Sequence, residues 1–237
     1  MSPPESGGAR VRVLSCGILR EELRALPSSL LERLDIVILD SILHMRPRDL
    51  ESGLYGLLEI APGAPSILVF GDCSPGMREL CERPGLIRIP GVNCCEIVLG
   101  RERYRNLRRQ GVFLFMPEWT ARWREVFESE LGFRSSDLAR GFMTDSMKAL
   151  AYVDTGVVPV PRAILDEIED FFGMPVRIEA AGLGNLESAL REALAKLESR
   201  EFGRTRDGPI PPEGDATSPA PRTAPCPSSS RTCWRRS

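Results

Sequence analysis

Short, continuous apolar runs alternate with amphipathic stretches along most of this chain. A run such as Asp35–Ser41 (DIVILDS) is typical of a strand buried on both faces, and the stretches between runs repeat apolar residues at helical spacing. Strands that alternate with helices build parallel sheets. We therefore expect an α/β fold, with a mostly parallel, Rossmann-like sheet and flanking helices. The expected strands are Arg10–Ser15, Asp35–Ser41, Ser66–Gly71, Leu86–Pro90, Val112–Met116, Leu150–Val153 and Val176–Glu179.

Composition divides the chain into a long body and a short tail. Residues 9–202 carry the alternating pattern and are expected to form a single α/β domain, whose two halves share a strand–turn–helix rhythm compatible with lobes at 9–111 and 112–202. Residues 203–237 are rich in Pro, Ser, Thr and Arg, so we expect a disordered C-terminal tail there. The expected helices are Arg20–Leu34, Arg48–Glu59, Pro75–Glu82, Cys94–Gln110, Glu118–Leu131, Arg162–Phe172 and Leu186–Glu198.

Charge and hydropathy narrow the class of protein. The net charge is −2 and no basic stripe crosses the body, which argues against a nucleic-acid partner. No apolar run approaches the roughly 18 residues that cross a bilayer, and the first residues lack the apolar core of a signal peptide. We expect a cytoplasmic protein without a membrane partner. In such a protein seven cysteines favour metal ligands, redox groups or buried thiols over disulfides.

A cysteine or a histidine follows each of the first four predicted strands. These residues are Cys16, the single histidine His44, Cys73 and Cys94. Because the carboxyl ends of parallel strands meet at one edge of the sheet, ligands scattered along the chain can converge there. Three cysteines and a histidine can bind zinc or an iron–sulfur cluster, or support thiol chemistry. Taken singly, each residue is also compatible with ordinary packing.

The neighbours of two cysteines carry further information. Cys73 lies in a GDCSPG turn ahead of a predicted helix N-terminus, a position that lowers the pKa of a thiol, and Asp72 is either its partner or a turn residue. Cys94 is followed directly by Cys95. Because adjacent helical side chains point about 100° apart, only one of the two is expected to face a shared ligand, and spacing alone does not choose between them. Asn93 is a natural N-cap for this helix, and Asn93 and Asp72 are both candidate ligand contacts.

Two features of the second half are also candidates for ligand binding. Trp119 and Trp123 are one helical turn apart, and Trp119 is a candidate ligand contact, although core packing is the commoner role of such a pair. The segment Asp154, Thr155 and Gly156 follows a predicted strand. Its hydroxyl and backbone N–H groups suit a hydroxylated or phosphate-bearing ligand, or a plain tight turn. No glycine-rich nucleotide-binding motif occurs.

Several of these segments together resemble a known family. They are the run IRIPGVNCCEIVLGRERYRNL at Ile87–Leu107, the Gly-Asp-Cys turn, the loop with His44 and the run AYVDTG at Ala151–Gly156. They are similar to the uncharacterised domain-of-unknown-function family 1638 of bacteria and archaea, over residues 11–197. The resemblance implies that the matching site positions are Cys16, His44, Cys73 and Cys94. Ser74 and Arg101 depart from the glycine and serine that are usual in the family.

The resemblance also implies a choice between the adjacent cysteines and a functional setting. Cys94, not Cys95, has the family's offset from the Leu99-Gly100 pair. Members are often encoded near corrinoid-dependent methyltransferase systems, which implies a role in or beside one-carbon metabolism and methyl transfer.

Three hypotheses of function follow. The first is a metal-binding Cys3His protein that holds zinc or an iron–sulfur cluster and has a small-molecule ligand and corrinoid methyltransferase proteins as partners. The second is a non-enzymatic module that binds or carries a small molecule or corrinoid without a metal, with His44 as a lower ligand to cobalt; the usual corrinoid motif D-x-H-x-x-G is absent, which ranks it second. The third is metal-free redox chemistry between Cys73 and a neighbouring cysteine. Whether the protein is an enzyme is left open.

Overall fold

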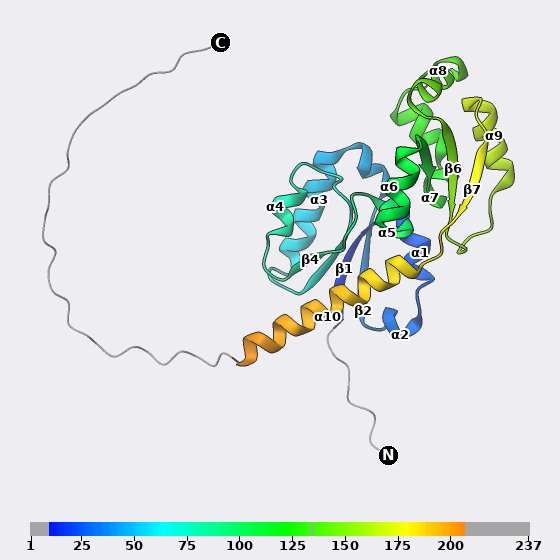
Figure 1. Cartoon of the computed structure of the whole chain (residues 1–237). Helices are drawn as coiled ribbons and strands as arrows, with labels where there is room; N and C mark the ends of the chain where they lie inside the picture. Colours follow the sequence, from blue (N-terminus) through cyan, green and yellow to red (C-terminus); the bar gives the residue numbers. More distant parts are fainter. Residues whose placement is uncertain (1–9, 134, 207–237) are drawn as a thin grey trace, which may run out of the picture.

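Two parallel β-sheets flanked by helices form the protein in a computed structural model, which describes residues 10–133 and 135–206 (Figure 1). The strand order is β2-β1-β3-β4 in the first sheet and β5-β6-β7 in the second, and every pairing is parallel. The predicted α/β architecture is confirmed. The strands are β1 (Val11–Cys16), β2 (Leu34–Leu39), β3 (Ser66–Val69), β4 (Leu86–Arg88), β5 (Val112–Phe115), β6 (Ala149–Asp154) and β7 (Val176–Ala180).

The first sheet brings three strand ends to one edge. Its inner strands β1 and β3 are largely or wholly buried, as expected for parallel strands covered on both faces. Cys16, the last residue of β1, lies opposite Leu39, the last residue of β2. Ser15 of β1 lies opposite Val69, the last residue of β3. The segments that follow β1, β2 and β3 therefore leave the sheet side by side.

Helix-breaking residues divide two helices that the periodicity predicts as continuous. The helical segments of the first lobe are η1 (Gly17–Leu19), α1 (Arg20–Arg24), α2 (Ser28–Leu31), η2 (Ser41–Met45), α3 (Pro47–Ile60), α4 (Met77–Cys81), α5 (Cys94–Leu99) and α6 (Arg101–Arg109). Pro27 separates α1 from α2, because it has no N–H to continue the helix. Gly100 separates α5 from α6 with a φ of +79°, a left-handed value that glycine adopts without strain.

The second lobe has an aromatic core of its own. Its helical segments are α7 (Pro117–Ala121), the π-helical η3 (Glu125–Glu130), α8 (Ser136–Ser146) and α9 (Arg162–Phe172). Phe127 and Phe172 meet edge-to-face with ring centroids 5.0 Å apart, and Phe115 packs against both. The predicted helix Glu118–Leu131 is thus two segments, and α8 was not predicted.

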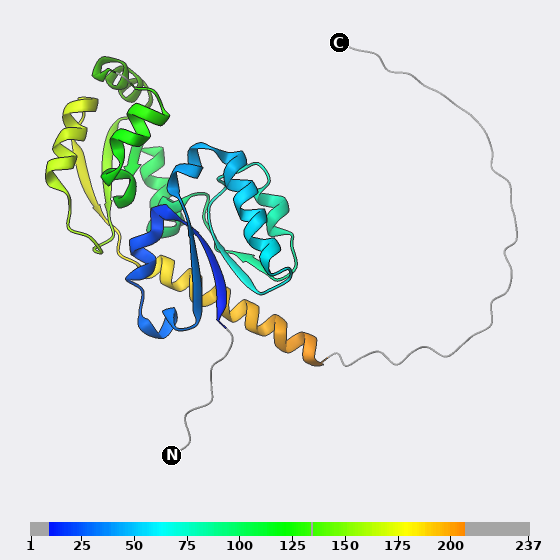
Figure 2. The ribbon, with the colours of Figure 1, turned by 180° about the vertical axis from the view of Figure 1, so that it is seen from behind.

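The last helix, α10 (Gly184–Arg206), returns to the first lobe. Both views show it running along that lobe (Figure 1, Figure 2), and it contacts α5, β3 and β4. Its buried leucines Leu186, Leu190 and Leu194 belong to the core of the first lobe. The predicted lobe boundary at residue 111 therefore separates the two sheets. It places α10 in the second lobe, whereas α10 packs against the first. The helix also runs past residue 202; residues 207–237, the rest of the predicted tail, lie outside the described residues.

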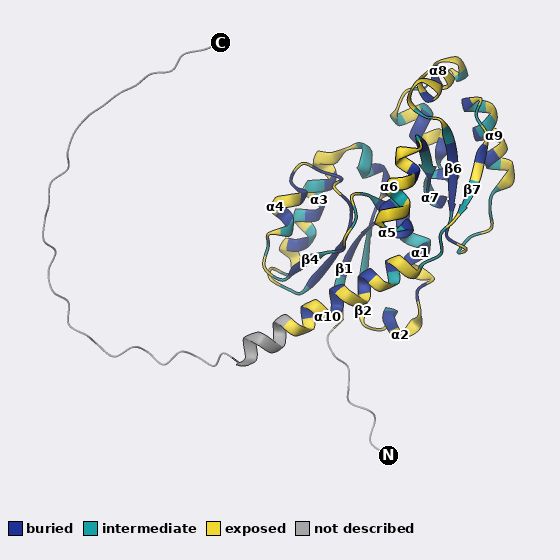
Figure 3. Cartoon of the chain, viewed as in Figure 1, coloured by how far each residue is buried: buried dark blue, intermediate teal, exposed yellow. Residues whose placement is uncertain are grey.

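Burial follows the layering of the two lobes. The helices turn their buried residues toward the sheets and their exposed residues outward (Figure 3). Within residues 10–133 and 135–206, no helix is both long and apolar enough to cross a bilayer.

Candidate functional site

Three buried cysteines lie at the edge where the strands of the first sheet end. Cys16 is the last residue of β1, Cys73 lies in the loop between β3 and α4, and Cys94 is the first residue of α5. Their exposed fractions are 3%, 8% and 5%, and all three belong to the same core. Thiols that are far apart in the sequence therefore gather inside one lobe.

Close backbone approaches bring these segments together. The N–H of Asp72 donates to the carbonyl of Val92 at 2.9 Å, which ties the Cys73 loop to the segment before Cys94. A Cβ on Gly71 would lie 2.2 Å from that carbonyl oxygen, so only glycine fits at this crossing. The local sequence thus dictates how closely Cys73 can approach Cys94.

Hydrogen bonding makes Cys16 the most acidic thiol of the group. The Cys94 thiol donates to Cys16, and the backbone N–H of Ile18 adds a second hydrogen bond; together they lower the pKa of Cys16 against the opposing effect of burial. The same hydrogen bond, with burial, raises the pKa of Cys94. Burial and the negative charge of Cys16 raise the pKa of Cys73 to about 11. Cys16 is therefore the thiol of this group that loses its proton most readily, whereas Cys73 and Cys94 keep theirs.

His44 lies in the wall of a cavity between the two lobes, a wall that it shares with Cys94. This interlobe cavity of about 250 Å³ is lined by Ile18, His44, Asn93, Cys94, Cys95, Tyr104, Arg108, Phe113, Leu114, Met116, Trp119 and Met147. The imidazole of His44 meets the Trp119 ring edge-to-face, with centroids 5.3 Å apart. Burial lowers its pKa, so the ring is neutral at pH 7. Cys94 is the one residue that belongs to both the thiol group and the cavity wall.

Thiols and an imidazole are the kinds of donor that bind a soft metal. Their arrangement in the structure meets only part of what a metal site requires. Thiolates and imidazole are ligands for zinc, and thiolates hold iron–sulfur clusters. Among the described residues, however, no three or more His, Cys, Asp or Glu side chains stand at the spacing of a metal site. The three thiols share a location and would have to turn toward a common point, whereas His44 is held against Trp119.

Two of the other predicted ligand contacts line the interlobe cavity. Asn93 caps α5 by accepting from the N–H of Glu96 at 2.9 Å, and its amide donates to the hydroxyl of Tyr104 at 2.6 Å. Trp119 reaches the cavity from α7, and its buried indole N–H has no hydrogen-bond partner in the described part of the chain. A ligand that offers an acceptor would satisfy that donor.

The remaining predicted contacts lie away from the cavity. Asp72 is mostly exposed and pairs with Arg88 at 2.5 Å. Asp154 accepts the N–H of Gly156 at 2.9 Å, the tight turn that the sequence offered as an alternative. Thr155 donates to Glu22 of α1 across the lobes at 3.0 Å. None of these residues lines the interlobe cavity.

Sequence reasoning missed two polar residues of the cavity wall, Tyr104 and Arg108. Both are on α6, inside the predicted helix Cys94–Gln110. The signal was Gly100, because a break there lets α6 take a new rotational phase. Arg108 lines the cavity and donates to the carbonyl of Val112 at 2.9 Å.

The buried carboxyl of Glu22 predicts a pH-dependent stability. Its exposed fraction is 1%, and burial raises its pKa above the usual carboxyl range. Because the folded state favours the protonated form, this group stabilises the fold at low pH, and that contribution is lost as the pH rises through the raised pKa. The Glu22→Gln variant has no such contribution to lose. Its free energy of unfolding is therefore expected to rise relative to that of wild type between pH 4 and pH 8. Urea denaturation measures it.

The matched control for that experiment is Glu21→Gln, on the same helix. Glu21 is half exposed and pairs with Arg24 at 2.8 Å. Its curve of stability against pH should run parallel to wild type. A Glu22→Gln curve that is also parallel would contradict the role of burial.

Comparison with known proteins places the chain in a family. The sequence profile described as "Protein of unknown function (DUF1638)" matches residues 38–190, more than half of the chain. The matched span contains His44, Cys73 and Cys94, and Cys16 precedes it. No curated protein and no solved structure gives a significant match. The chain therefore belongs to the DUF1638 family, as its resemblance to that family predicts.

Proposed function

We propose that this protein binds a soft metal centre, either zinc or an iron–sulfur cluster, through Cys16, Cys73 and Cys94. The observation that carries the proposal is the gathering of three buried thiols from three segments, with Cys94 hydrogen-bonded to Cys16. A thiolate is the form that binds such metals. The lowered pKa of Cys16 favours that form, and a core position excludes competing water.

The other two thiols make binding dependent on pH. Cys73 and Cys94 are protonated at pH 7, because their pKa values are raised. Both must lose a proton to become ligands, so binding releases protons and the affinity rises with pH. Zinc with three thiolates and an open position would supply Lewis acidity; a cluster would supply electron transfer or a structural centre.

We propose that His44 acts from the wall of the interlobe cavity on a small-molecule ligand held there. The neutral imidazole can accept a proton, and Cys94 lies in the same wall. This arrangement favours an open metal centre over a closed one with four protein ligands. An open three-thiolate centre suits methyl transfer to a thiol, and the proposed setting beside corrinoid-dependent methyltransferases rests on the family resemblance.

A second candidate is a carrier of a small molecule or corrinoid that holds no metal. It is favoured by the indole N–H of Trp119, which has no hydrogen-bond partner among the described residues and lies in the cavity wall. In that case His44→Ala would weaken ligand binding while metal analysis of wild type remains blank.

Metal analysis of the full chain, purified without oxygen, tests the proposal. We expect one metal centre per chain: colourless protein with stoichiometric zinc, or brown protein with acid-labile sulfide. The expected affinity for added zinc increases from pH 6 to pH 8. Protein that carries no metal, and takes up neither zinc nor iron with sulfide, would overturn the proposal and favour the metal-free carrier.

A further inference from the structure

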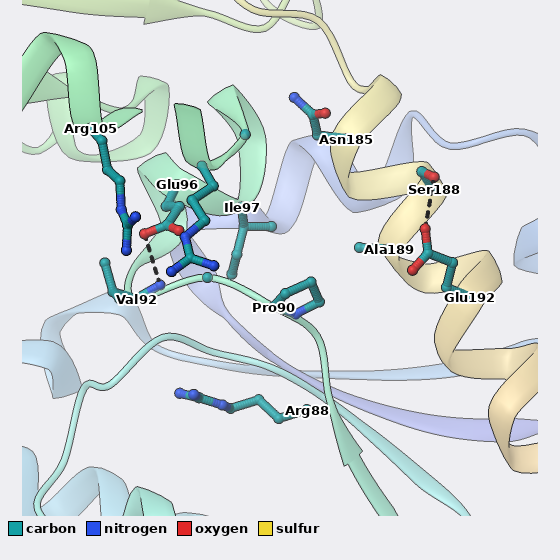
Figure 4. Close-up of a pocket in the computed structure, with 13 residues that line it drawn as sticks. Arg88, Pro90, Val92, Glu96, Ile97, Arg105, Asn185, Ser188, Ala189 and Glu192 are labelled. Atoms are coloured by element: carbon teal, nitrogen blue, oxygen red, sulfur yellow. Dashed lines mark hydrogen bonds between the residues drawn. The ribbon is translucent and has the colours of Figure 1, made fainter. Parts of the chain in front are cut away.

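A second cavity lies at the edge of the first lobe, and none of the three thiols lines it. It measures about 380 Å³ and is bounded by the loop after β4, by α5 and α6, and by the first turns of α10 (Figure 4). In the close-up, Glu96 and Arg105 stand on one wall, and Asn185 and Ser188 of α10 stand on another. The carboxyl edge of a parallel sheet is a common place for a ligand, and this volume suits a small molecule.

Two arginines of this cavity lack the partners that arginines elsewhere on the helix have. Arg101 and Arg105 are one turn apart on α6 and both line the cavity. Within the described residues neither forms an ion pair, whereas Arg103 on the same helix pairs with Glu179 at 2.8 Å. Adjacent guanidinium groups that form no ion pair within the described residues are well suited to a phosphate, which they can bind in bidentate fashion.

A nearly buried carboxylate shares the same cavity. Glu96 is 8% exposed, and its Oε2 accepts the N–H of Val92 at 3.3 Å. Its Oε1 makes no hydrogen bond to any described residue, and Glu192 adds a second carboxylate to the wall. A bare anion would be repelled by these two groups. Hydroxyl groups on the same ligand would instead donate to them.

The N-terminus of the long helix α10 lies at this cavity and favours an anion there. It begins at Gly184, and Asn185 and Ser188 of its first turns line the cavity. The N-terminus of a helix carries a partial positive charge and unpaired backbone N–H groups, which favour a phosphate. The two arginines, the N-terminus of α10 and the carboxylate of Glu96 therefore lie around the same cavity.

We propose that this cavity binds a phosphate-bearing small molecule with hydroxyl groups, of the sugar phosphate class. Arg101 and Arg105 hold the phosphate, and Glu96 accepts from a hydroxyl. No residue of the thiol group or of the interlobe cavity takes part, so this proposal is independent of the metal centre.

Isothermal titration of the full chain with ribose 5-phosphate, inorganic phosphate and ribose tests it. Ribose 5-phosphate is expected to bind about tenfold or more tightly than phosphate, and ribose is expected not to bind. Arg101→Gln and Arg105→Gln should each weaken the affinity for ribose 5-phosphate about tenfold or more. Arg109→Gln is the matched control: Arg109 is an exposed arginine of α6 that does not line the cavity, and its affinity should equal wild type.

Glu96→Gln tests the hydroxyl contact separately. Removing the charge should strengthen the binding of inorganic phosphate. The difference in affinity between ribose 5-phosphate and inorganic phosphate should therefore become smaller. The proposal is overturned if neither probe binds, if Arg109→Gln weakens binding as much as Arg105→Gln, or if phosphate binds as tightly as ribose 5-phosphate to wild type.

Discussion

Cys94→Ala is expected to abolish metal binding, whereas Cys95→Ala leaves it unchanged. The two residues are adjacent and the substitution is the same, yet only Cys94 donates a hydrogen bond to Cys16. Cys95 lines the interlobe cavity, and burial raises the pKa of its thiol to about 12. Loss of one thiolate of three should cost more than the roughly 10–100-fold typical of residues that only support a ligand.

Metal content and visible absorption after anaerobic purification measure the difference. Alanine is chosen because both side chains lie among apolar neighbours, so neither variant buries a new polar group. Circular dichroism confirms that each variant is folded. Equal metal content in the two variants, whether full or absent, would contradict Cys94 as a ligand and would remove the main structural argument for the three-thiol centre.

The sheet edge could be predicted because parallel strands have a simple geometry. A continuous apolar run such as DIVILDS indicates a strand buried on both faces, and the ends of such strands meet whatever their order in the sheet. The grouping of Cys16, Cys73 and Cys94 follows from that rule. Between Cys94 and Cys95 the rotational phase of α5 decides, and spacing does not reveal it; only the family resemblance pointed to Cys94.

The strand-end rule describes one sheet and says nothing of a second sheet or of contacts between lobes. Asp154 and Thr155 also follow a strand, but β6 belongs to the other sheet, so Thr155 meets Glu22 instead of a ligand cavity. His44 follows β2, and its partner Trp119 comes from the other lobe. How the lobes dock depends on tertiary packing that no local pattern records.

The sequence pattern also failed to predict helix α8. Helix α8 exposes two large apolar residues, Leu138 and Phe142, and contains Gly141. Its apolar residues Leu138, Ala139, Phe142 and Met143 do recur at helical spacing, but the stretch is short and its central glycine lowers the helix propensity. Its contacts with α9 stabilise it in the structure.

Gly71→Ala is expected to destabilise the protein by about 3 kcal/mol or more, at the upper end for overpacking. A Cβ at this position would lie 2.2 Å from the carbonyl oxygen of Val92 and 2.5 Å from the Cα of Asn93. Both are backbone atoms, so no side chain can turn aside to relieve the clash. The hydrogen bond from Asp72 to Val92 is expected to break as the two loops separate. Urea denaturation measures the loss.

Gly56→Ala is the matched control, because no atom lies within 4 Å of the added Cβ and the residue is inside α3. There the helix propensity of alanine should stabilise the protein by about 1 kcal/mol. The clash at Gly71 also separates the Cys73 loop from the start of α5. Folded Gly71→Ala protein is therefore expected to bind metal more weakly than Gly56→Ala protein. A Gly71→Ala variant with the stability and metal content of wild type would show that the two loops need not touch, and the close approach of Cys73 to Cys94 would lose its structural cause.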